Sequence, residues 1–130
     1  MANRNLKRDR GALEKGLVDV YANVAIGSSG APTLTAKQNY GIASVVRVSA
    51  GLYTITLQDK FARIVDFNAN FLNSTGAHTI FQVVLKADSV STSTPSFQIQ
   101  CNNASGTATD PSSGATMILH VDLKNSGIGA

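Results

Sequence analysis

Apolar and polar residues alternate with a period of two along most of this chain, a pattern typical of β-strands with one buried face. The alternating segments are Leu17–Ile26, Leu52–Gln58, Val65–Phe71, Ser96–Cys101 and Met117–Lys124. In the third of them, Val65, Phe67, Ala69 and Phe71 share the apolar face. The residues expected in the core on this ground are Phe67, Phe71, Phe97, Ile99, Leu119 and Val121.

Two further segments are rich in β-branched residues without strict alternation. Ile42–Ser49 has mixed faces, and it is joined to the strand beginning at Leu52 by Ala50-Gly51, which predicts a β-hairpin. Thr79–Lys86 is more continuously apolar, as expected of a central strand.

Small and polar residues separate these segments and predict loops at Gly27–Pro32, Asp88–Pro95 and Asn102–Gly114. Short strands at this spacing favour an all-β fold, an antiparallel two-sheet sandwich that is jelly-roll-like, with an extended N-terminal arm. A length of 130 residues indicates one domain. We expect an arm at 1–16, a β-sandwich domain at 17–124 and a flexible tail at 125–130.

The net charge lies in the arm. Residues 1–16 contain five basic and two acidic residues, and the rest of the chain is neutral, so the arm carries the whole net charge of +3. Such an arm suggests contact with an acidic surface or with nucleic acid, and the alternative is a frayed terminus without a role. A short helix at Leu6–Gly16 would need a partner surface. The basic residues are Arg4, Lys7, Arg8, Arg10 and Lys15.

Residues able to bind metal are few. His120 and Asp122 share the polar face of the last strand, where a metal site or an acid–base pair is conceivable, but we expect only a polar contact. His78 should hydrogen-bond to a loop. Two histidines and one cysteine do not supply the four ligands of a structural zinc site. Calcium in the loop 102–113 stays open, although the acidic spacing of a calcium loop is absent. We expect no metal and no cofactor.

No catalytic motif is evident, and we expect no enzymatic activity. Cys101 aligns with the apolar face of its strand and should be a buried thiol. The chain has no Gly-x-Ser-x-Gly elbow, and Gly27-Ser-Ser-Gly30 lacks the lysine of a phosphate-binding loop. Nucleic-acid binding is not favoured, because the arm has no aromatic residue on which bases could stack.

Neither a secretory signal nor a membrane span is expected. The basic N-terminus is not followed by an apolar stretch, and no apolar run approaches the ~18 residues of a membrane helix. We therefore expect synthesis in a cytoplasm and no contact with a membrane.

Two segments resemble known proteins. Val45–Phe61 (VVRVSAGLYTITLQDKF) resembles a hairpin common in small virion proteins of tailed bacteriophages. Gly106–Pro111 (GTATDP), followed by Met117–Asn125, resembles their closing loop and strand. The resemblance covers roughly the last two-thirds of the chain, and it is to capsid decoration, or cement, proteins.

The resemblance implies a homo-oligomer, often a trimer, that sits on the outer head shell and strengthens it. Its partners would be the major capsid protein and other copies of itself, and it would be located at the capsid surface of a virion, after synthesis in the host cytoplasm. The basic residues of the arm would then contact the capsid or a neighbouring subunit. Two alternatives remain: a tail, neck or fibre component, and a β module that binds carbohydrate or nucleic acid.

Overall fold

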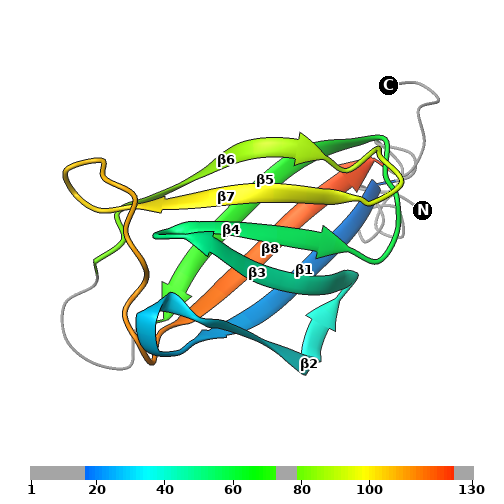
Figure 1. Ribbon diagram of the computed structural model, residues 1–130. Helices are drawn as coiled ribbons and strands as arrows, with labels where there is room; N and C mark the ends of the chain where they lie inside the picture. Colours follow the sequence, from blue (N-terminus) through cyan, green and yellow to red (C-terminus); the bar gives the residue numbers. More distant parts are fainter. Residues whose placement is uncertain (1–16, 73–78, 125–130) are drawn as a thin grey trace, which may run out of the picture.

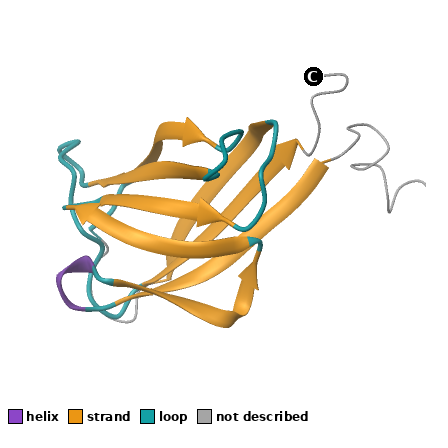
Figure 2. Cartoon of the chain, turned by 45° about the vertical axis from the view of Figure 1, so that its right-hand side comes forward, coloured by secondary structure: helices purple, strands orange, loops and turns teal. Residues whose placement is uncertain are grey.

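The fold consists of two four-stranded antiparallel sheets packed face to face (Figure 1). It was obtained as a computed structural model that describes residues 17–72 and 79–124. Strands dominate the cartoon in Figure 2, and the one helical segment in the described part of the chain is the short 3-10 turn η1 at Ser28–Gly30. The predicted all-β two-sheet sandwich is confirmed.

Each sheet combines strands that are consecutive in the sequence with strands that are far apart in it. The first sheet has the order β2-β1-β8-β5, formed by Pro32–Tyr40, Leu17–Ile26, Thr116–Lys124 and Arg63–Leu72. The second sheet has the order β3-β4-β7-β6, formed by Ile42–Ser49, Leu52–Leu57, Ser96–Asn102 and Gln82–Ser89. The pairing of β1 with β8 therefore joins opposite ends of the described chain.

The core lies between the sheets and is built from the apolar halves of the alternating strands. Phe97 and Ile99 of β7 and Leu119 and Val121 of β8 are buried, as predicted. Phe67, like Phe71, is only partly buried and packs against this core, because both lie on the edge strand β5. Its ring meets that of Phe97 edge to face, with centroids 5.9 Å apart.

The predicted hairpin of β3 and β4 is present. Ser49 pairs with Leu52, which leaves Ala50 and Gly51 as the loop. Gly51 has φ +71°, a conformation that favours glycine over residues with a side chain. The local sequence thus specifies this turn directly.

The segment Thr79–Lys86 was wrongly predicted to be a central strand. The strand β6 begins at Gln82, after the buried Ile80, and it forms the edge of the second sheet. The central position beside β4 is taken by β7, whose outward face carries serine and glutamine. The apolar run therefore lies at the edge of the sheet, and Phe81 within it is 60% solvent-exposed.

Two details of the strands were also missed. A β-bulge between Ile64 and Asp66 turns Val65 outward, so that Val65 is 40% exposed and Ile64 packs on the core in its place. The strand β2 at Pro32–Tyr40 was not predicted, and it begins inside the expected loop Gly27–Pro32. Its pairing with β1 has a register shift of its own.

Several predicted features lie outside the described residues. They are the arm 1–16 with its short helix, His78 and the tail 125–130. Among the residues that the structure describes, no helix is long and apolar enough to cross a membrane.

Candidate functional site

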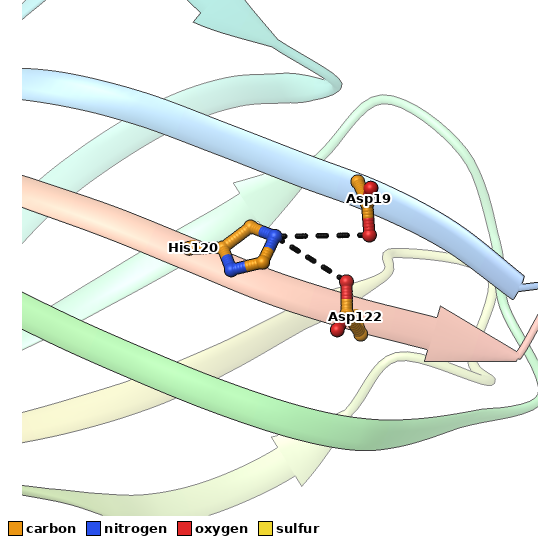
Figure 3. A group of neighbouring side chains, drawn as sticks. All are labelled: Asp19, His120 and Asp122. Carbon is orange, nitrogen blue, oxygen red and sulfur yellow. Dashed lines mark ion pairs between the residues drawn. The ribbon is translucent and has the colours of Figure 1, made fainter. Parts of the chain in front are cut away.

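A histidine and two aspartates come together on the outward face of the first sheet (Figure 3). His120 and Asp122 lie two residues apart on β8, so their side chains point to the same face. Asp19 lies on the neighbouring strand β1, directly opposite Asp122 in the antiparallel register. Both strands are central in the sheet, which holds the three side chains on a rigid support.

The imidazole of His120 stands between the two carboxylates. Its Nε2 atom lies 3.3 Å from Oδ1 of Asp122 and 3.7 Å from Oδ1 of Asp19. One ligand atom from each residue lies within 4.8 Å of the other two. Such a group has two uses: a protonated imidazole forms ion pairs with both carboxylates, and a neutral imidazole joins them in binding a cation.

A third carboxylate continues the row. Asp66 of β5 lies opposite Asp122 on the far side of β8, so Asp19, Asp122 and Asp66 occupy matching positions on three adjacent strands. Like charges that face each other across a sheet destabilise it. Asp122 is the middle one, and only 9% of its surface is exposed. Two basic residues lie beside this row: Lys124 follows Asp122 by two positions on β8, and Arg63 of β5 pairs with Lys124.

Another acidic residue, Asp110, connects the loop after β7 with the β3–β4 hairpin and with the turn η1. Asp110 accepts two hydrogen bonds from the guanidinium of Arg47, at 2.9 and 2.8 Å, and a third from the backbone N–H of Gly51 at 2.9 Å. A Cβ atom on Gly30 would come within 2.5 Å of the Asp110 carboxyl carbon. Tyr53 completes the group, because its hydroxyl donates a 2.7 Å hydrogen bond to the Gly30 carbonyl. We name these five residues the Asp110 clamp.

The Asp110 clamp bears on the calcium site that the sequence left open in the loop 102–113. The hydrogen bonds from Arg47 hold the pKa of Asp110 below its ordinary value, and the N–H of Gly51 adds to the effect. Because both carboxylate oxygens bind Arg47, the one acidic side chain in the loop 102–113 is already engaged and does not favour calcium there. The same carboxylate packs against Gly30. Its negative charge would repel a phosphate in the turn that begins at Gly27.

Cys101 is a fully buried thiol on β7, as predicted. Burial is the main reason that its pKa rises to about 12, with a smaller contribution from the negative charge of Asp110. A thiol this hard to ionise is a poor nucleophile.

An open groove lies where the edge strands of the two sheets approach each other. It has a volume of about 290 Å³ and is lined by residues 69–71 of β5 and by residues 80–83 at the start of β6. Phe81, which lines the groove, is 60% exposed, and Leu72, which follows the lining residue Phe71 in the sequence, is 64% exposed.

The structure describes one of the sites predicted from the sequence and does not describe the other. The polar contact of His120 with Asp122 is confirmed, and the structure adds Asp19, which the sequence analysis did not connect with them. Asp19 could have been found only by assuming that β1 pairs with β8. The basic residues proposed for attachment, Arg4, Lys7, Arg8, Arg10 and Lys15, lie outside the described residues.

Comparisons with protein-family models, with curated proteins and with solved structures find no match to this chain.

Proposed function

We propose that this protein is a structural component of a virion, which binds the outer surface of a tailed-phage capsid and stabilises it. The observation that carries the proposal is the apolar edge of the sandwich, where Leu72 and Phe81 are exposed beside the groove between β5 and β6. Exposed apolar side chains that gather at one place favour a protein–protein contact. The resemblance of Val45–Phe61 to hairpins of decoration proteins implies that the partner is the major capsid protein.

The energetic scale of such a contact is modest for one copy. Covering the exposed 60% of Phe81 removes on the order of 120 Å² of apolar surface from water, worth about 3 kcal/mol. A capsid presents many equivalent sites, and an oligomer that engages several of them gains affinity by avidity. This is consistent with the trimer that the resemblance implies.

Co-sedimentation with purified capsids tests the proposal. The wild-type protein should pellet with intact heads, and the double variant Leu72→Ser/Phe81→Ser should lose most of this binding. Val46→Ser is the matched control, because Val46 is 54% exposed on the edge strand β3 of the same protein, away from the groove. Equal binding of the double variant and the control would reject the apolar edge as the contact.

The rival functions give different results in parallel assays. Pelleting with purified tails and not with heads would indicate a tail, neck or fibre component. Salt-sensitive retention on DNA, or a signal on a glycan array without capsid binding, would indicate a nucleic-acid or carbohydrate module. Light scattering at micromolar concentration should give the mass of an oligomer, and a strict monomer both free and on the particle would contradict the oligomer.

A further inference from the structure

The donor atoms of His120, Asp19 and Asp122 lie close together without forming short hydrogen bonds. Charge-assisted N–H···O bonds have lengths of about 2.7–2.9 Å. The two N–O separations of His120 are 3.3 and 3.7 Å, longer than such bonds. Atoms bound to one metal ion at about 2.0–2.2 Å lie roughly 3.0–3.5 Å from one another, in tetrahedral or octahedral geometry. The separation of 3.3 Å lies within this range and that of 3.7 Å slightly outside it, and all three ligand atoms lie within 4.8 Å of one another, so a small movement of the exposed Asp19 side chain would place the set around one ion.

The charge of the row provides a second and separate argument. Asp19, Asp122 and Asp66 occupy facing positions on three adjacent strands, and such like-charge pairs destabilise a sheet. A divalent cation bound by Asp19 and Asp122 would reduce the repulsion between these two carboxylates. The central strands β1 and β8 pair over their whole length, so the ligands are held in place before the ion binds.

We propose that Asp19, His120 and Asp122 bind a first-row divalent cation, with the remaining coordination positions filled by water. One imidazole nitrogen and two carboxylate oxygens are ligands that suit Zn²⁺ or Mn²⁺. Calcium and magnesium prefer oxygen ligands alone, so they should bind this site weakly. The proposal is independent of the capsid function, because it concerns the free protein.

The test is calorimetric titration of the full chain with ZnCl₂ at pH 7.5, with MnCl₂ and CaCl₂ titrated in parallel. We expect about one Zn²⁺ per chain, together with a rise in melting temperature that EDTA reverses. His120→Gln and Asp19→Asn should each weaken Zn²⁺ binding at least tenfold. Absence of binding by the wild type at 1 mM Zn²⁺ would overturn the proposal, as would calcium binding as tight as zinc.

Two matched variants control for general attraction of cations. Asp66→Asn removes a carboxylate from the same row but outside the three-residue group, and His78→Gln removes the other histidine. Both should bind Zn²⁺ as the wild type does. If Asp66→Asn weakened binding as much as Asp19→Asn, the site would be only a diffuse negative patch, and the proposal would be wrong.

A spectroscopic measurement keeps the test independent of folding defects in the variants. In wild-type protein, Zn²⁺ should shift the Nε2 nitrogen resonance of His120 in long-range ¹H–¹⁵N spectra and leave that of His78 in place. A shift confined to His78 would place the metal elsewhere and contradict the proposal.

Discussion

The carboxylate of Asp110 stabilises the fold through three hydrogen bonds to one β-hairpin that is distant in the sequence. Arg47 lies on β3, and Gly51 lies in the hairpin loop that follows it. All three bonds are made to the ionised carboxylate, which is why the pKa of Asp110 is lowered in the folded protein. This single residue therefore fixes the long loop after β7 against the β3–β4 hairpin.

The lowered pKa of Asp110 predicts a loss of stability in acid. In the unfolded chain an aspartate titrates near ~3.9, so the stabilisation is present above that pH and is lost as the pH falls through the lower folded value. Asp110→Asn should lower the melting temperature at pH 7 and should flatten this part of the acid dependence. Urea unfolding between pH 3 and 7 measures both effects, with Asp59→Asn as the exposed control. Parallel acid profiles for wild type and Asp110→Asn would refute the assignment.

Burial of Cys101 predicts the opposite pH dependence. Its pKa rises to about 12, so the folded protein keeps the thiol proton where the unfolded chain loses it. The stabilisation is complete below the unfolded pKa of ~8.5 and declines as the pH rises toward 12. We expect no reaction with a thiol reagent at pH 8 until urea unfolds the protein. Cys101→Ser should lose less stability between pH 8.5 and 10.5 than wild type does, and rapid labelling of the native thiol would contradict its burial.

At the scale of the elements, the β3–β4 hairpin depends on a close approach as well as on a turn. Gly51 and Gly106 both have positive φ, at 71° and 79°. A Cβ atom at Gly51 would lie 2.6 Å from the carbonyl oxygen of Cys101 and from the nitrogen of Thr109, whereas nothing lies within 4 Å of one at Gly106. The glycine in the hairpin thus has a steric role that the one in the loop lacks.

This difference gives a matched pair of variants. Gly106→Ala should reduce the free energy of unfolding by about 1 kcal/mol, the cost of a left-handed alanine. Gly51→Ala should reduce it by roughly 3 kcal/mol or more, because backbone atoms on β7 and its loop must also move. Chemical denaturation of both variants measures the difference. Equal losses would mean that conformation alone accounts for the requirement at Gly51.

At the scale of the whole molecule, the arm and the sandwich are expected to have separate roles. Residues 1–16 hold the net charge of the chain, and the sandwich has a core of its own. Deleting the arm should leave the melting temperature nearly unchanged and weaken capsid binding, and the remaining binding should depend less on salt, because exposed charges are screened over ~8 Å. A full-length variant with its five basic residues changed to glutamine separates charge from chain length.

Two results would contradict this division. Equal capsid occupancy with and without the arm, across a salt series, would leave the arm without a role in attachment. A large fall in melting temperature on deletion would mean that the arm packs on its own domain. Asp19 lies three residues after the arm ends, so the acidic row of Asp19, Asp122 and Asp66 would be the first surface to examine in that case.

Features that depend on residues adjacent in the chain could be predicted without the structure. Period-two alternation identified β1, β4, β7 and β8 and the buried faces of Phe97 and Leu119, because successive side chains in a strand point to opposite sides. A glycine in a two-residue loop predicted the β3–β4 hairpin. These are local rules, and together they led to the correct fold class.

Which strands pair, and in which register, could be learned only from the folded molecule. The edge position of β6, the bulge that turns Val65 outward and the contact of Arg47 with Asp110 all depend on partners far along the chain. The group of Asp19, His120 and Asp122 exists because β1 pairs with β8, although β1 begins at Leu17 and β8 only at Thr116. Alternation fixes the face on which a residue lies, whereas its neighbours on that face are set by pairing between distant strands, which no local pattern encodes.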